Sequence, residues 1–210
     1  KKLGMTQVYT ADGSSVAVTV ISVSGNQVLQ VKKSTEKDGY SAVQVGFDDQ
    51  SEKRVTKAQF GHFKRWGATT PKRKIQEFRL ASDDQLPAEG TVLGADLFAA
   101  GAPVDVIGVT KGRGFQGVVK RHNFSGQPAT HGHMMHRRTG SIGCRLTPGL
   151  VWKNQKMPGH MGVVRRTVQN LKVVQSRPEE GVLLVSGCVP GNEGTYVIVR
   201  PAKKAKVAKA

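Results

Sequence analysis

A chain of 210 residues is long enough for one large domain or two small ones with a real hydrophobic core. Its apolar runs fall short of the ~18 residues that cross a bilayer, and no secretory signal pattern opens it, so we expect no membrane partner. Cys144 and Cys188 match neither a zinc motif nor a disulfide framework and favour a reducing compartment, while a net charge of +17 predicts a polyanionic partner.

The outer parts of the chain have the pattern of short β-strands separated by glycine and proline turns. Residues 15–23 show it best, because valines alternate with smaller or polar residues between two glycine turns. The chain starts inside an expected strand and without Met, so we expect a trimmed N-terminus. Strands at this spacing favour an antiparallel barrel over βαβ units. In chain order, the expected strands are residues 1–9, 15–23, 27–33, 40–47, 74–81, 103–109, 165–174, 181–189 and 195–202.

Two helices are expected within this mainly β chain. Residues 56–67 have Thr56 as an N-cap and Gly67 as a C-terminal stop. A shorter helix is expected at residues 115–122. The tail, residues 203–210, is too short and too basic to pack, and we expect it to be frayed until it meets a partner.

The charge is concentrated in the middle of the chain. From Val106 to Pro178 there is no Asp or Glu in 73 residues, yet this stretch holds 13 of the 32 Lys and Arg and five of the six His. A solvated face would mix both signs of charge, so the absence of acids indicates a partner that repels carboxylates. Between His122 and Arg165 no period of 2 or 3.6 persists, which predicts an irregular segment that is either disordered alone or held by something outside it.

Three histidines, His131, His133 and His136, have the density of metal ligands. The nearest carboxylates in the sequence are Asp105, 26 residues before His131, and Glu179, 43 residues after His136, so no acid is close by in sequence to orient the imidazoles or to balance a dication, and neighbouring arginines would repel one. Acid–base catalysis is disfavoured as well, because a catalytic histidine usually needs a partner that fixes its tautomer. Histidines on a solvated loop remain an alternative, but imidazoles on an irregular basic backbone are best suited to stacking on bases or bonding phosphates of folded RNA.

A G-x-G-x-x-G pattern is present at Gly112, Gly114 and Gly117 after an expected strand. A dinucleotide site or a kinase loop would also need an acid, and the next one, Glu179, is 62 residues after Gly117. The glycines are better explained by close approach of the backbone to a phosphate chain.

A second basic cluster lies in the stretch KAQFGHFKRWGATTPKRK, where Phe60, Phe63 and Trp66 are interleaved with cations. The two phenylalanines are spaced to bury one helix face. Whether the cations touch nucleic acid or are simply solvated stays open. They are Lys57, Lys64, Arg65, Lys72, Arg73 and Lys74.

Several strings occur in order along nearly the whole chain: KKLGMTQVY, TKAQFGHF, KGRGFQGVVKRHNF, GSIGCRLTPGLVWKNQKMPGHMG, RRTVQNLKVV and GCVPGNEGTYVIVRPA. In these strings the chain resembles the family of the third protein of the large ribosomal subunit, in its bacterial form. The T-P-G and K-M-P-G-H-M-G strings are specific to that family.

The resemblance implies a mainly β fold: an antiparallel β-barrel body of the translation-protein type with a long irregular basic extension. The body would comprise residues 1–123 and 163–202 with a small α/β elaboration at about 48–90, and the extension residues 124–162, turning near 143–149. The tail would be residues 203–210.

The resemblance also implies a structural, non-enzymatic constituent of the ribosome, bacterial or organellar, in the cytoplasm in the bacterial case. It would bind the 23S-type rRNA early in assembly near its 3′ end, beside neighbouring large-subunit proteins, and its extension would reach toward the peptidyl-transferase centre. No metal, cofactor or small-molecule substrate is expected. The expected rRNA-binding residues are Lys111, Arg113, Lys120, Arg121, His122, His131, His133, His136, Arg137, Arg138, Arg145, Trp152, Lys153, Lys156, His160, Arg165 and Arg166.

The chain departs from the family pattern in three places. Leu146 occupies the position of a glutamine that is methylated in some relatives, so we expect that modification to be absent. Trp152 stands where Phe is common, and the histidine triplet is richer than the family pattern. Two other classes of protein stay open: a metal-dependent nuclease, and a free-standing RNA-binding regulator found outside ribosomes.

Overall fold

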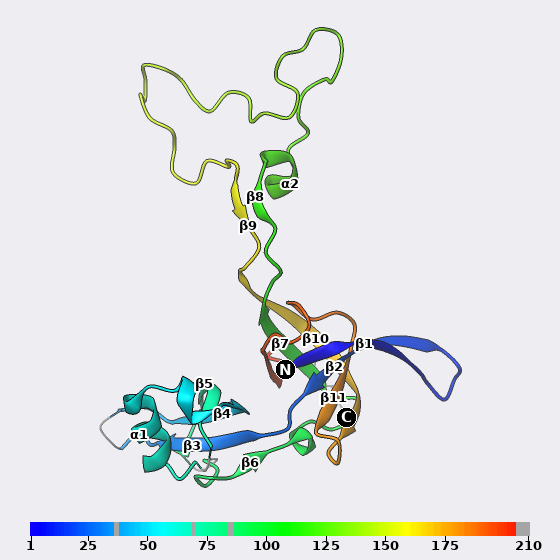
Figure 1. The fold of residues 1–210 in the computed structure, drawn as a ribbon. Coiled ribbons are helices and arrows are strands. Elements are labelled where there is room, and N and C mark those ends of the chain that lie inside the picture. Colours follow the sequence, from blue (N-terminus) through cyan, green and yellow to red (C-terminus); the bar gives the residue numbers. More distant parts are fainter. Residues whose placement is uncertain (36–37, 69, 84–85, 205–210) are drawn as a thin grey trace.

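The computed structural model describes residues 1–35, 38–68, 70–83 and 86–204. Most of the tail expected at 203–210 therefore lies outside the described residues. Figure 1 shows a body of strands, a smaller sheet beside it that carries a helix, and a long arm that projects away from both. In the part of the chain that is described, no helix is long and apolar enough to span a membrane.

The body is a six-stranded antiparallel sheet in the order β1-β2-β11-β10-β7-β12. Its two edge strands approach each other, because the Lys2 amide donates to the Thr195 carbonyl at 2.9 Å and the Gly194 amide donates to the Lys2 carbonyl at 2.7 Å. These bonds join the start of β1 to the turn that precedes β12, so the two edges of the sheet meet at that end. The strands are β1 (Lys2–Tyr9), β2 (Ser15–Ser22), β7 (Pro103–Val109), β10 (Arg165–Arg177), β11 (Val182–Ser186) and β12 (Val197–Pro201).

The core of the body follows from the alternation of side chains along its strands. In β11, Leu183 and Val185 belong to the main core cluster, while Val182 and Leu184 pack into a second cluster on the opposite side of the sheet. A strand that is buried on both faces needs a continuous apolar sequence, and VLLV provides it.

A buried carboxylate shapes the long strand β10. Asp105 of β7 is fully buried and accepts the backbone amide of Asn170 at 3.2 Å, where the β7–β10 register shifts. Asn170 has a φ of +57°, which marks a bulge in the strand. The other Asp105 oxygen lies 3.4 Å from the Arg200 guanidinium of β12. One side chain therefore links three strands at the bend that leads β10 toward the arm.

The smaller sheet, called the elaboration here, has the order β5-β4-β3-β6 and its own core of Val28, Val43 and Val45. It includes β3 and β4 in addition to much of the expected segment 48–90, because these strands pair directly with their neighbours. Tyr196 ties it to the body by donating to Asp48 at 2.5 Å. Its strands are β3 (Asn26–Lys32), β4 (Ala42–Asp49), β5 (Lys72–Arg79) and β6 (Val92–Leu93).

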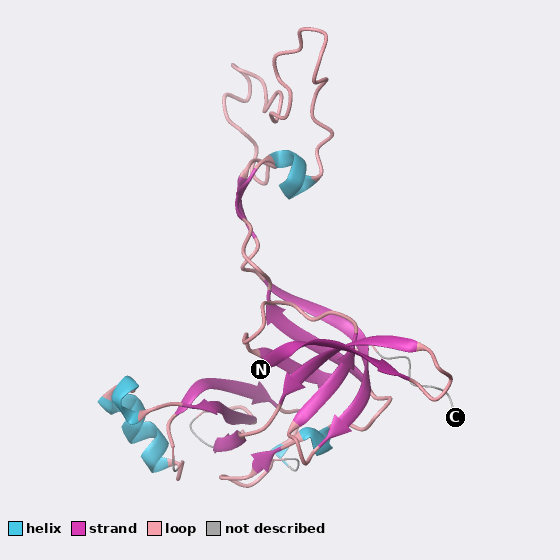
Figure 2. Ribbon diagram, turned by 45° about the vertical axis from the view of Figure 1, so that its right-hand side comes forward, coloured by secondary structure: helices cyan, strands magenta, loops and turns pink. Residues whose placement is uncertain are grey.

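The expected mainly β fold is confirmed, and Figure 2 shows how little of the chain is helical. The first expected helix is confirmed as α1 (Lys57–Arg65), with Thr56 and Gln59 forming a capping box. The second was placed too early: α2 is Val118–His122, and Phe115 lies in β8 (Gly114–Gln116), which pairs with β9 (Gly159–Met161). Two single-turn 3₁₀ helices, Glu52–Arg54 and Ala95–Leu97, complete the described elements.

Candidate nucleic-acid interface

The arm consists of residues 110–164 and contains the expected extension. It leaves the body at the end of β7 and returns at the start of β10, so both of its ends are fixed by the same pair of strands (Figure 1). The Thr110 amide donates to the Val164 carbonyl at 3.0 Å, and the Arg113 amide donates to the Met161 carbonyl at 2.9 Å. With β8 and β9, these bonds make a narrow two-stranded neck.

A close backbone crossing restricts the neck to glycine at one position. Gly162 has a φ of +85°, and a Cβ there would overlap the Lys111 carbonyl oxygen and lie 2.9 Å from the Gly112 Cα. The next residue, Val163, has a φ of +50° although it is β-branched. This is a strained conformation that the surrounding contacts must hold in place.

A polar clasp joins α2 to the returning strand. Arg121 donates from Nη1 to the Met157 carbonyl at 2.7 Å, and His122 Nε2 lies 3.1 Å from the same oxygen. Only a protonated nitrogen can donate to a carbonyl, so Nε2 carries the proton. A Cβ on Gly159 would lie 2.6 Å from Arg121 Nη1, so a glycine is needed for the guanidinium to approach.

Beyond α2 the arm has almost no internal structure. Residues 124–158 contain no helix or strand, and no residue from 119 to 172 is buried. A few turns hold it locally, including the Gln127 amide to the His136 carbonyl at 2.6 Å and the Arg138 amide to the Met135 carbonyl at 2.9 Å. A chain of this length with no buried side chain does not hold one shape through a core of its own.

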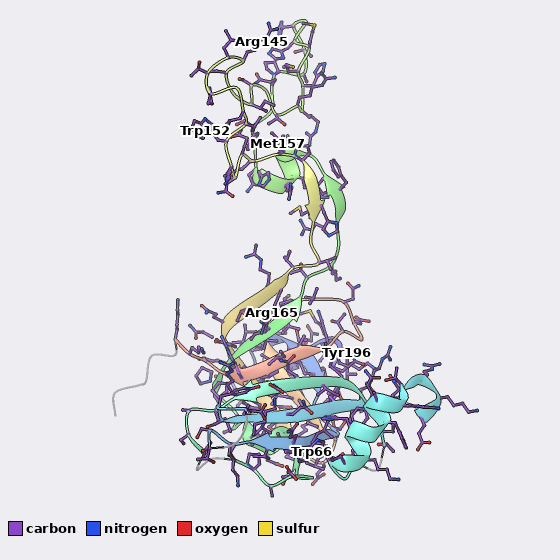
Figure 3. All side chains as sticks on the ribbon, turned by 90° about the vertical axis from the view of Figure 1, so that its left-hand side faces the viewer. Trp66, Arg145, Trp152, Met157, Arg165 and Tyr196 are labelled. Atoms are coloured by element: carbon purple, nitrogen blue, oxygen red, sulfur yellow. The ribbon has the colours of Figure 1, made fainter. Side chains whose placement is uncertain are left out.

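The predicted site residues are nearly all accessible. Figure 3 places Arg145 near the far end of the arm, Trp152 at its side, and Arg165 where the arm joins the body. Fourteen of the predicted residues are exposed. They are Lys111, Arg113, Lys120, His131, His136, Arg137, Arg138, Arg145, Trp152, Lys153, Lys156, His160, Arg165 and Arg166.

Three predicted residues are half-buried and have partners within the arm. Arg121 and His122 form the clasp on Met157. His133 accepts the Met135 amide through Nδ1 at 3.2 Å. These side chains are engaged in shaping the arm, which the sequence could not reveal because their partners are backbone atoms.

The histidine triplet lies on a tightly turned backbone. His131 and His136 have φ angles of +58° and +43°, a region in which His is one of the commoner residues after glycine. Within the described residues, no group of three His, Cys, Asp or Glu side chains is arranged to hold a metal ion. The G-x-G-x-x-G glycines also lie apart from any nucleotide fold: Gly114 begins β8, an antiparallel strand, and Gly117 precedes the five-residue α2.

Sequence reasoning missed the large apolar side chains that the arm exposes, apart from Trp152, which was among the predicted site residues. Leu146 is 88% exposed, Met134 86% and Trp152 66%. They lie between glycines and prolines without a period, so no pattern signalled them. Apolar groups in such a density on a soluble surface indicate that a partner covers them. The others are Phe115, Met135, Ile142, Leu150, Val151, Val163 and Val164.

An antiparallel β body that carries a basic arm without acids and without a core of its own is typical of proteins that bind nucleic acid. The family model described as ribosomal protein L3 matches residues 75–181. A protein of Akkermansia muciniphila named large ribosomal subunit protein uL3 is 58% identical over 97% of this chain and 96% of its own length. Proteins with the same name from Thioalkalivibrio sulfidiphilus and a Geobacillus species are 53% and 49% identical, each over 98% of this chain and 96% of their own. The chain belongs to the ribosomal protein L3 family, in its bacterial type, and the expected resemblance is confirmed.

Proposed function

We propose that the chain is a structural, non-enzymatic constituent of the large ribosomal subunit and that its arm binds the large-subunit rRNA directly. One observation carries this proposal: residues 119–172 include no buried residue and no carboxylate, yet they are rich in exposed Lys and Arg. Such a segment gains its order from a partner that supplies negative charge. The names of the relatives, as large-subunit proteins, support the same partner.

The arm would act by neutralising phosphates where rRNA helices crowd together. Each exposed Lys or Arg that meets a phosphate releases counterions, and the absence of Asp and Glu removes the repulsion that would oppose this. The left-handed turns at His131 and His136 let the backbone follow the RNA surface instead of a regular period. Flat side chains suit unstacked bases, so we assign stacking to Trp152 and to the exposed histidines.

The clasp has a different role within this mechanism. Arg121 and His122 hold Met157, so α2 and the returning strand move as one piece. They are therefore positioning residues in our proposal, while Arg137, Arg138 and Arg145 contact phosphates. The exposed Leu146 and Met134 would fill the apolar spaces between stacked bases, where a charged side chain would lose its hydration.

The finer part of the proposal concerns place and time. The body binds early in assembly, near the 3′ end of the 23S-type rRNA and beside neighbouring large-subunit proteins, and the end of the arm points toward the peptidyl-transferase centre. The ribosome in question is cytoplasmic. The function needs no cofactor, no small-molecule substrate and no membrane, because positioning and charge neutralisation suffice.

Cys144 offers a natural test, because it is exposed and next to Arg145 near the far end of the arm (Figure 3). An iron–EDTA probe attached there, in a Cys188→Ser background, would cleave nearby rRNA in reconstituted large subunits. We expect cleavage clustered at the peptidyl-transferase centre. Cleavage confined to distant rRNA would overturn the proposed position, and a chain that sediments apart from ribosomal subunits would instead favour a free-standing regulator.

A further inference from the structure

A second acid-free segment lies outside the arm, in the elaboration. Between Glu52 and Glu77 there is no Asp or Glu, and every third residue on average is Lys or Arg, a higher density than in the arm. The proposed function of the arm makes no use of this segment. Its basic residues are Lys53, Arg54, Lys57, Lys64, Arg65, Lys72, Arg73 and Lys74.

The helix within this segment is almost uncovered by the rest of the protein. Phe63 is the one residue of α1 that is buried, and a 2.7 Å hydrogen bond joins His62 to Gln44 of β4, while the capping box at Thr56 stabilises only the start of the helix itself. A nine-residue helix is marginal in water without packing on several faces. The exposed faces of α1 are therefore available to a partner, and Figure 1 shows α1 at the outer edge of the elaboration.

Three cations on α1 are free to meet that partner. Among the described residues, Lys57, Lys64 and Arg65 form no ion pair. Lys72, by contrast, is half of a pair, because its ammonium lies 2.6 Å from the Asp49 carboxylate. Arg73 and Lys74 of β5 likewise form no ion pair among the described residues, so the uncompensated charge lies on the helix and on the start of the strand that follows it.

The same surface offers a flat apolar contact beside the cations. An open hollow is floored by Phe63 and edged by Phe60, whose side chain remains 38% exposed. Arg65, which follows the lining residue Lys64 in the chain, has its guanidinium 5.4 Å from the centre of the Trp66 ring, an arrangement that presents a planar cation. Aromatic floors flanked by cations are how proteins hold an unstacked base and its phosphates. The remaining lining residues are Lys64, Gly67, Ala68 and Pro71.

We propose that this surface, formed by α1 and the turn after it, is a second RNA-binding site that takes an unstacked base and its flanking phosphates. The inference rests on the proposed function, because it assigns the site to the same large-subunit rRNA. Figure 3 places Trp66 at the end of the molecule opposite Arg145. Two contacts so far apart on one rRNA bind together at a high effective concentration, so each strengthens the other without any contact between them.

The first test maps rRNA around the helix in reconstituted large subunits. An iron–EDTA probe is attached through Ala58→Cys on α1, with Cys144 and Cys188 replaced by serine, and compared with the probe on the native Cys144. A third probe at Ala11→Cys, also exposed but on the turn between β1 and β2, sets the background of the body surface. We expect strong rRNA cleavage from position 58, at nucleotides different from those cut from position 144.

The outcomes separate the two proposals. If position 144 cleaves rRNA and position 58 cleaves no more than position 11, the second site is overturned while the proposed function stands. If no position cleaves rRNA, the proposed function itself fails. Cross-linking of position 58 to a neighbouring protein in place of rRNA would also overturn the second site and assign the surface to a protein partner.

The second test measures the full-length chain on large-subunit rRNA across a salt series. Lys64→Gln with Arg65→Gln should reduce the slope of log affinity against log salt by about two, one for each phosphate contact. The matched control, Lys33→Gln with Lys172→Gln, removes the same charge from exposed positions outside the cluster and should change the slope by much less. Equal changes in both variants would mean that only the net charge matters, and would contradict a site.

Discussion

Leu183 in the body and Leu146 in the arm are the same residue type in opposite surroundings. Leu183 is fully buried in the main core cluster, whereas Leu146 is 88% exposed. In the body, apolar side chains pack into a core and the buried carboxylate finds its partners within the same chain. The arm has two fixed ends, a clasp and no buried residue between 119 and 172, so its stable shape depends on what lies outside it. A protein can thus divide its chain between a self-sufficient part and a part that a partner completes.

Removing the arm should have the largest effect on rRNA binding, and it tests directly whether the body is independent of the arm. Deleting residues 125–156 and joining Phe124 to Met157 by a short Gly-Ser linker removes five Lys and Arg from the proposed interface. The salt dependence of rRNA binding should fall by about four to five in slope, since each is proposed to contact a phosphate. Unfolding of the body, followed by circular dichroism, should keep its midpoint.

The control for that deletion is a full-length arm in which the same five residues are replaced by Gln. Loss of affinity in this variant would assign the effect to charge, and retained affinity would assign it to the apolar side chains and backbone. A deletion that also unfolds the body would contradict its independence of the arm.

Truncating one leucine in each region compares what each side chain contributes to the free energy of unfolding. Leu183→Ala should lower the free energy of unfolding by about 2–5 kcal/mol, because it leaves a cavity among well-packed residues. Leu146→Ala should change it by less than about 0.5 kcal/mol, because nothing packs on that side chain in the free protein. Denaturant titration of both variants decides this, and equal effects would show that the arm has a core in solution.

The neck is the boundary between the body, which has its own core, and the arm, which has none. Gly162→Ala should open it, since the new Cβ would overlap the Lys111 carbonyl oxygen. Gly114→Ala is the matched control, because Gly114 also has a positive φ but open space around its Cβ position, and should cost only about 1 kcal/mol. Hydrogen exchange at the Arg113 amide, which bonds to Met161, should accelerate far more in the first variant. Similar exchange rates in both variants would mean that the positive φ, and not the overlap with the Lys111 oxygen, causes the destabilisation.

Acid should affect the body and elaboration more than the arm, because the arm has no carboxylate. The Tyr196 hydroxyl holds the pKa of Asp48 below its ordinary value, while burial acts in the opposite direction. With its folded pKa depressed, Asp48 stabilises the fold above its unfolded pKa of about 4, and this contribution is lost as the pH falls through the folded pKa.

Asp48→Asn should therefore destabilise the chain at pH 7 by roughly 1 kcal/mol, and by less at pH 3, which lies below the unfolded pKa. Thermal unfolding of the variant and of the natural chain at both pH values measures the difference. Tyr196→Phe should reproduce the effect, since it removes the same hydrogen bond. A penalty that persists at pH 3 would assign the role of Asp48 to its shape rather than its charge.

The strands of the body could be predicted because each has a recognisable local pattern of residues. Alternating valines predicted β2, and Thr56 as an N-cap predicted the start of α1. The neck strands β8 and β9 escaped prediction, because three residues are too few for a period and their pairing joins positions some forty-five residues apart. The clasp escaped for a related reason: the partner of Arg121 and His122 is a backbone carbonyl, which any residue at position 157 would offer.

The candidate interface was predictable as a charge distribution but not as a geometry. The lack of acids between Asp105 and Glu179 is visible in the sequence, whereas the half-buried state of His133 and the exposure of Leu146 depend on turns without a pattern. Contacts that form only with a partner leave no periodic signal within the chain.

The most direct test of the central claim is the binding of the purified chain to large-subunit rRNA and to an unrelated structured RNA across a salt series. With ~6–10 phosphates contacted, affinity should fall by about 10³–10⁵ between ~50 and ~200 mM salt. We expect a clear preference for the large-subunit rRNA that survives at the higher salt. Equal, salt-sensitive binding to both RNAs would contradict it and would reduce the arm to a generic binder of polyanions.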